Sequence, residues 1–152
     1  MMLQKYWENG LIPGIEGITF QNGKVFLYVD GSCKTKTPFK FRETTLANEE
    51  KDYSFENMSI EFDIYIEVIH EESKGSVVCG ECEMGNQGFV LFKNKDNVVI
   101  WSLFQSFANP FLNDLKIENN LIYVSTEIQY FFEIPIYNPE RLSCVSKNPW
   151  NY

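Results

Sequence analysis

The sequence predicts a mainly β fold: a single-domain antiparallel β-sandwich or curled sheet over residues 1–152, with at most one or two short helices. Turn signals recur every ~8–14 residues between short apolar runs. Aromatic residues make up 16% of the chain, and Phe and Tyr fit pleated strands well. No segment sustains a helical period, and neither a repeat nor a linker divides the 152 residues.

In the N-terminal third, the best place for a short helix is 3–9, "LQKYWEN". Asn22-Gly23 lies between two apolar-rich runs and predicts a tight hairpin turn. A short strand is expected at 39–42. The segment 43–57 has no clean period and is expected to be a loop with at most one helical turn.

The rest of the chain predicts a series of strands. A hairpin is expected through Glu118-Asn119-Asn120, and Pro110 ends the long apolar run before it. The final strand contains Pro135, which indicates a sheet edge because proline cannot donate to a ladder. The expected strands lie at 58–69, 77–84, 89–93 and 98–107, on both sides of the 118–120 turn, and within 129–142.

Residues 60–70, "IEFDIYIEVIH", alternate between apolar and polar side chains. This is the pattern of a strand with one buried face. The odd-numbered positions carry Glu61, Asp63, Tyr65 and Glu67. We therefore expect these four side chains to share one solvent-exposed face.

Negative charge is concentrated around this strand. Residues 43–72 hold ten acids and one base, whereas the rest of the chain holds 11 acids and 12 bases, for a net charge of -8. The preceding segment, 24–42, is basic, with five bases and only Asp30 as an acid. Such asymmetry indicates an interaction surface, although a solvated face that keeps the protein in solution explains the charge equally well.

The four cysteines are expected to be reduced thiols in a soluble, cytoplasmic protein, because the N-terminus lacks a signal peptide and no window approaches the ~18 apolar residues of a membrane span. They are Cys33, Cys79, Cys82 and Cys144. The CxxC motif at 79–82 has no second ligand pair for zinc, and its two cysteines would point to opposite faces of a strand. We expect no metal and no cofactor.

No catalytic motif is present. His70 is the only histidine, so any Ser–His or Cys–His pair must use it, but it looks like an exposed strand end followed by Glu71 and Glu72. Glu61 and Asp63 have a spacing that fits two-carboxylate hydrolysis, but this acidic face lacks the apolar wall that raises a general acid's pKa. The acidic balance also disfavours nucleic-acid binding. The sequence predicts no enzyme.

Two C-terminal segments, "VIWSLFQSFANPF" at 99–111 and "EIPIYNPERL" at 133–142, resemble a pattern of small bacterial immunity proteins. These proteins are found beside polymorphic or contact-dependent inhibition toxins. In that pattern an apolar strand ends in an Asn-Pro-Phe turn, and a later strand ends in a proline-containing phrase. The resemblance covers about the C-terminal third and implies an intracellular binding protein without enzyme chemistry. It carries over no toxin-contacting residue.

The acidic strand and the resemblance together predict an immunity protein that binds and neutralises a cognate toxin, a basic nuclease domain. Carboxylates match the Lys and Arg of such a partner and steer association, and Tyr65 would supply an aromatic anchor. The sequence leaves open the toxin's identity, the oligomeric state, and whether segment 43–57 joins the strand face. The predicted partner-binding residues are Glu61, Asp63, Tyr65, Glu67, Glu49, Glu50, Asp52, Glu56, Glu71 and Glu72.

Two other classes of function are alternatives. The first is a small β-barrel or sandwich that binds an apolar or sugar ligand. Its candidate wall residues are Trp101, Phe104, Tyr123 and Phe131. The second is a metal-dependent enzyme that uses Cys79, Cys82 and His70.

Overall fold

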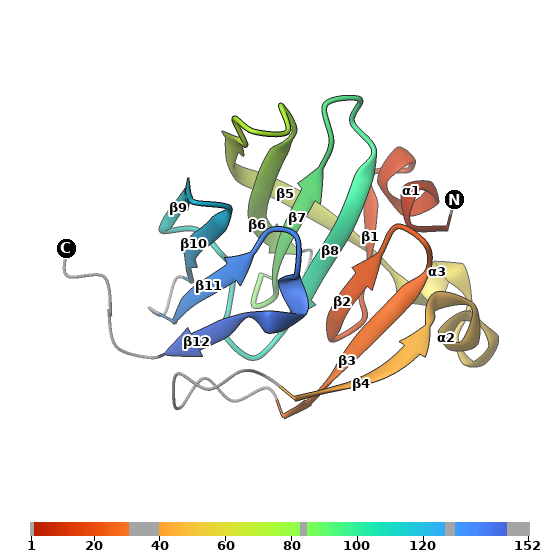
Figure 1. Cartoon of the computed structure of the whole chain (residues 1–152). Helices are drawn as coiled ribbons and strands as arrows, with labels where there is room; N and C mark the ends of the chain where they lie inside the picture. The colour runs from red at the N-terminus through yellow and green to blue at the C-terminus, as the bar shows by residue number, and fades with distance from the viewer. Residues whose placement is uncertain (1, 31–39, 83–84, 127–129, 146–152) are drawn as a thin grey trace.

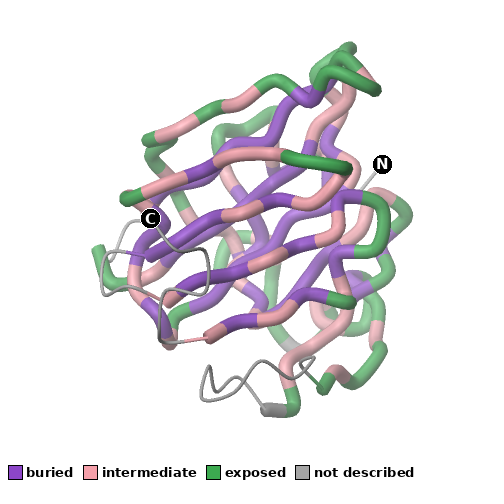
Figure 2. Tube along the Cα trace, turned by 60° about the vertical axis from the view of Figure 1, so that its left-hand side comes forward, coloured by how far each residue is buried: buried purple, intermediate pink, exposed green. Residues whose placement is uncertain are grey.

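The computed structural model describes residues 2–30, 40–82, 85–126 and 130–145, and over these the chain is mainly β, as predicted. They form an eight-stranded and a four-stranded antiparallel sheet (Figure 1). Buried positions concentrate along the strands, and exposed ones at the loops and helix surfaces (Figure 2).

The larger sheet is curled. Ile12 of its first strand packs in the same core as Val99 and Phe104, which lie four strands away. This curl lets one face of the sheet wrap around part of the core. In spatial order, the strands of this sheet in the described residues are β1 (Leu11–Pro13), β5 (Ser59–Ile69), β6 (Ser76–Cys82), β7 (Gly88–Lys93), β8 (Val99–Gln105), β2 (Gly17–Phe20), β3 (Lys24–Asp30) and β4 (Lys40–Thr45).

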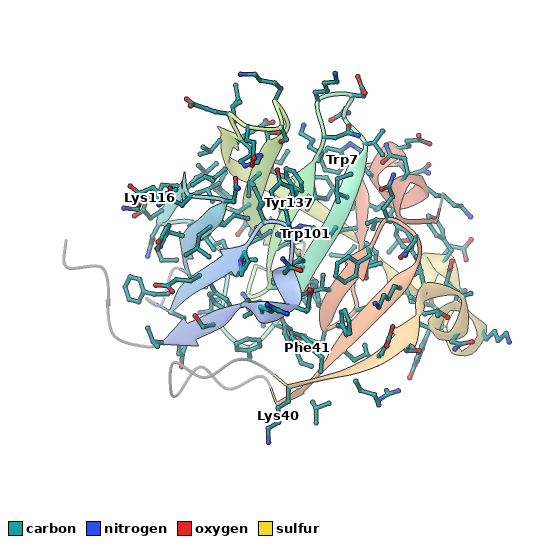
Figure 3. The ribbon with its side chains drawn as sticks, viewed as in Figure 1. Trp7, Lys40, Phe41, Trp101, Lys116 and Tyr137 are labelled. Atoms are coloured by element: carbon teal, nitrogen blue, oxygen red, sulfur yellow. The ribbon has the colours of Figure 1, made fainter. Side chains whose placement is uncertain are left out.

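The smaller sheet packs face to face on the larger one. Ile122 and Phe132 of the smaller sheet share a core with Val90 and Leu103 of the larger, all fully buried. Trp101, which is labelled in Figure 3, also joins the two layers. Its indole Nε1–H donates to the carbonyl oxygen of Ile136 at 2.8 Å. The smaller sheet's described strands are, in order, β12 (Ser143–Val145), β11 (Phe131–Pro135), β10 (Leu121–Ser125) and β9 (Asp114–Glu118).

Short helices cover the concave face of the larger sheet. Helix α1 (Met2–Glu8) appears where the sequence predicts it, and its Trp7 ring stacks on Phe62 with centroids 5.3 Å apart. Two more helices, α2 (Leu46–Asp52) and α3 (Phe55–Met58), lie on the same side of the molecule as α1 (Figure 1). Thus the described residues hold three short α-helices, one more than the sequence predicts.

Helices α2 and α3 replace the expected loop at 43–57. Thr45 and Ser54 act as N-caps, and each side chain accepts a hydrogen bond from the backbone N–H three residues on. Leu46 and Met58 are buried against Val25 of β3. The expectation of a loop with at most one helical turn is therefore wrong, because capping and burial stabilise helices too short to show a period.

Both predicted hairpins are present. Asn119 and Asn120 have φ angles of 52° and 61°, the left-handed conformation that a two-residue turn between β9 and β10 requires. Between β2 and β3 the positive φ, 91°, falls on Gly23, whose N–H donates to the carbonyl of Phe20 at 2.9 Å.

Pro135 does not mark a sheet edge. It is the last residue of β11 and pairs with Leu121, where the ladder ends, while β11 itself lies between β10 and β12. A terminal position explains why proline is tolerated there. Strand β12 was not predicted, since three residues are too few to show alternation.

The described cysteines include both free thiols and a disulfide-bonded cysteine. Cys79 and Cys82 are free and buried, and they pack in different cores on opposite faces of β6, as their spacing predicts. Cys144 is disulfide-bonded, so the expectation of reduced thiols is wrong at this position. Cys33 lies outside the described residues.

Candidate protein-binding surface

Strand β5 carries a β-bulge in its middle. Ile64 pairs with Gly80 and Ile66 pairs with the preceding β6 residue, Cys79. Tyr65 is therefore the extra residue, which shifts the register by one position. Gly80 accommodates this bulge because it has no side chain: a Cβ there would lie 1.9 Å from the carbonyl oxygen of Asp63.

The bulge exchanges the two faces of β5. Before it, Ile60 and Phe62 pack in the core beneath α1. After it, Ile66 and Val68 pack in the core between the two sheets. A one-residue shift moves every later side chain to the opposite face. The prediction that the four odd-numbered side chains share one face is therefore wrong.

Glu61, Asp63 and Tyr65 remain together, on the face opposite Phe62, and all three are exposed. Asp63 pairs across the ladder with Glu81, and the Tyr65 hydroxyl donates to Glu81 Oε1 at 2.6 Å. Glu81 thus adds a carboxylate to this face. The sequence gives no signal for its role, because it lies within the CxxC motif of another strand.

Glu67 lies on the other face of β5. Its Oε2 accepts a hydrogen bond from Ser76 Oγ at 2.7 Å and is 3.3 Å from Lys93 Nζ. The same ammonium lies 5.3 Å from the centroid of the Trp7 ring. The hydrogen bond from Ser76, assisted by Lys93, lowers the pKa of Glu67 below its ordinary 4.5. Glu67 is therefore engaged within the fold.

This lowered pKa makes a small part of the stability dependent on pH. Glu67 stabilises the folded state above its ordinary pKa of 4.5, and this contribution is lost as the pH falls through its lower folded value. Because the side chain is 44% exposed, we expect only a few tenths of a kcal/mol. The Glu67→Gln variant should be less stable at neutral pH, and its difference from wild type should shrink below pH 4.5. Urea unfolding at several pH values measures this, and a difference that grows on acidification contradicts it.

His70 is buried, with 3% of its surface exposed, so its expected place on the surface is wrong. Its Nδ1 lies 2.6 Å from Ser73 Oγ, and its Nε2 lies 2.7 Å from Asn120 Oδ1. The amide oxygen only accepts, so Nε2–H donates to Asn120, while Nδ1 pairs with the Ser73 hydroxyl. His70 thereby fastens the turn after β5 to the β9–β10 hairpin. Asn120 lies 50 residues away in sequence, too far for local reasoning to find.

The remaining predicted acids lie at the two ends of β5. Glu71 and Glu72 follow the strand, and Glu72 accepts a hydrogen bond from the Tyr137 hydroxyl at 3.0 Å. The other group is on α2 and α3, which lead directly into the start of β5. Segment 43–57 therefore precedes β5 as two helices, and Leu46 and Met58 at the ends of these helices pack in a core that holds neither Glu61 nor Asp63. Of the predicted acids on these helices, Glu49, Glu50 and Glu56 have described side chains, whereas the side chain of Asp52 is outside the described part of the chain.

Asp63 and Glu67 lie on a part of β5 that forms an edge of the sheet, whereas Glu61 pairs with Leu11 of β1. Strand β1 pairs only with Ser59–Glu61, and no strand in the described residues pairs with the outer side of β5 beyond that point. We call residues Phe62–Ile69 the β5 edge. On it Ile64, Tyr65 and Ile69 are 45%, 51% and 67% exposed. Carboxylates and half-exposed apolar side chains therefore lie along one strand with an open side.

The residues proposed for the alternative functions are not brought together. Trp101 and Phe104 lie in different cores, on opposite faces of the larger sheet. Tyr123 and Phe131 alternate with Ile122, Val124 and Phe132, which face the core, so they lie on the outer face of the smaller sheet. His70 packs at the end of β5, and within the described residues no three His, Cys, Asp or Glu side chains form a metal-binding group.

Comparison of the chain with protein-family models, with curated proteins and with solved structures finds no match. In the part of the chain that the structure describes, none of the helices has the length and apolar character to cross a membrane.

Proposed function

We propose that this chain is an immunity protein, which binds one cognate toxin domain of basic charge and neutralises it. The observation that carries the proposal is the coincidence of exposed carboxylates and exposed apolar side chains along β5. Apolar side chains supply binding energy, and carboxylates select a partner rich in Lys and Arg and speed its association. In this proposal the chain catalyses nothing and needs no cofactor.

A nuclease domain is the toxin class whose charge fits best. Such a domain binds nucleic acid through a positive cleft, so Glu61 and Asp63 would take the place of phosphates. Tyr65 would serve as the aromatic anchor beside them. The resemblance of segments 99–111 and 133–142 to small immunity proteins supports the same class of function.

A cytoplasmic location belongs to the proposal, because an immunity protein must meet the toxin inside the cell that it protects. The free thiols of Cys79 and Cys82 fit a reducing compartment. The disulfide at Cys144 weighs against it, since such compartments rarely retain structural disulfides.

The proposal is tested by co-expression with each basic toxic domain encoded next to the gene of this protein, followed by titration of the purified pair. We expect growth to be restored and binding to be stoichiometric. The double variant Glu61→Lys, Asp63→Lys should bind at least about tenfold more weakly and associate more slowly, with a smaller dependence on salt. The face that it alters is the one opposite Phe62.

A matched control is Glu8→Lys with Glu43→Lys, which changes the net charge equally. Both residues are exposed, and Glu43 is on β4, at the opposite edge of the larger sheet. This control should bind like wild type. If it weakens binding as much as the β5 variant, the effect comes from overall charge and the β5 surface is not the site. If no co-expressed toxin is neutralised, the immunity function itself is rejected.

A further inference from the structure

We infer that the β5 edge binds its partner by strand addition: an extended, basic segment of the partner pairs with the open side of Phe62–Ile69. This inference rests on the proposed function and states how the binding occurs. The first observation is the length mismatch between β1, with three residues, and β5, with eleven. A strand with an open side presents unpaired backbone N–H and C=O groups to any chain that can pair with it.

The second observation is the apolar surface on this edge. Among the described residues, six large apolar side chains are exposed, and three of them, Ile64, Tyr65 and Ile69, are on β5. An added strand would cover these side chains on both faces, because neighbouring strands place their side chains beside one another. Strand β9 contacts β5 from the other sheet, but no ladder joins the two strands. No described strand therefore pairs with the outer side of Phe62–Ile69.

Charge decides between the possible occupants. A second copy paired antiparallel through the same edge would bring Glu61 and Asp63 of one copy toward the end of β5 in the other copy, where Glu71 and Glu72 follow the strand, and like charges on paired strands are destabilising. Charged side chains and bulges are also the features by which natural edge strands avoid pairing with themselves. A segment with Lys or Arg at alternate positions instead places its cations on the face of Glu61, Asp63 and Glu81. The occupant is therefore an extended basic segment of another protein.

The test uses a short peptide of alternating lysine and valine, with the purified protein at low salt and backbone amide NMR as the readout. We expect saturable binding, with the shift changes concentrated at Phe62–Ile69. A peptide with the same lysines but with proline at the valine positions keeps the charge, lacks the N–H of every second residue, and is held in a polyproline-like conformation that does not fit a ladder. It should bind at least about tenfold more weakly, because the backbone hydrogen bonds are lost.

Each outcome of this comparison has a definite meaning. Equal binding of the two peptides, or no binding of the lysine–valine peptide, overturns strand addition. Either result leaves the immunity proposal standing if the toxin is still neutralised, because a toxin can dock on side chains alone. Conversely, strand addition survives if the peptide binds but no toxin is neutralised.

A second readout uses the protein without any peptide. In the variant Glu61→Gln, Asp63→Asn the repulsion between copies is reduced, so sedimentation should show more self-association than in wild type. The same variant should bind the lysine–valine peptide more weakly. If the variant stays as monomeric as wild type, these carboxylates do not keep copies of the chain apart, and charge no longer excludes a second copy as the occupant.

Discussion

Replacing His70 with alanine is expected to lower the free energy of unfolding by about 3 kcal/mol. The substitution removes a buried ring and its two hydrogen bonds, to Ser73 and Asn120. It also leaves a cavity beside Phe92, whose ring centroid lies 5.8 Å from that of His70. Equilibrium unfolding in urea measures the loss, and a loss below about 1 kcal/mol would show that the ring does not fasten the two turns.

A double-mutant cycle separates this link from simple loss of packing. Asn120 has a φ of 61°, so the partner variant is Asn120→Gly, which removes the side chain and still accepts the left-handed backbone. If the hydrogen bond between His70 and Asn120 joins the turns, the two losses should be less than additive by about 1 kcal/mol. Additive losses would indicate that the two residues act independently.

Replacing Gly80 with alanine is expected to cost about 3 kcal/mol, or to force β5 out of its register. The new Cβ would lie 1.9 Å from the Asp63 carbonyl oxygen and 3.1 Å from the Tyr65 nitrogen. Both are backbone atoms at the bulge, so no side chain can rotate away to relieve the contact. Calorimetry or urea unfolding measures the loss, and the amide NMR spectrum of β5 shows whether the strand has shifted.

The control for Gly80→Ala is Gly10→Ala, which tests a different cost. Gly10 has a φ of 72°, but nothing lies within 4 Å of the position that its Cβ would occupy. Alanine there is penalised only by its backbone conformation, by about 1 kcal/mol. If Gly80→Ala lowers the free energy of unfolding by no more than Gly10→Ala does, then the bulge does not require a residue without a side chain at position 80.

The alternation at 60–70 predicts the strand correctly and its faces incorrectly, for a physical reason. If both halves of β5 packed against the same core, a bulge at Tyr65 would interrupt the alternation of apolar and polar residues in the sequence. In this fold the register shift coincides with a change from the core beneath α1 to the core between the sheets. The register shift turns the even-numbered residues to the other face of β5, and the change of core places the apolar environment on that face. The apolar residues therefore stay at even positions although they face opposite sides before and after the bulge.

Local signals predict the features that depend on neighbours along the chain. The Asn119-Asn120 turn, the Gly23 turn and helix α1 are where residue preferences place them. The burial of His70 and the roles of Glu81 and Lys93 depend on contacts between distant strands. No pattern within one segment of the sequence predicts these contacts. Glu71 and Glu72, which follow His70, wrongly indicate that His70 is exposed.

The three carboxylates of the acidic strand have different roles in the folded chain. Glu67 contacts Ser76 and Lys93 on one face. Asp63 lies exposed on the other face, on the open side of β5, and Glu61 is exposed on that same face, where β1 pairs with β5. Solubility alone would not require exposed apolar side chains along the same strand. The combination is the one expected of an edge that repels its own copy and accepts a basic partner.

Binding by strand addition requires an open β5 edge, and amide hydrogen exchange on the free protein tests this most directly. In a strand paired on one side only, the amides that point away from the neighbour have no ladder partner and exchange fast. We predict that Phe62–Ile69 contains such fast amides between slow ones that point to β6, while β6 and β7, paired on both sides, are protected throughout. Uniform protection of Phe62–Ile69, at the level of β6 and β7, would contradict an open edge and with it the proposed mode of binding.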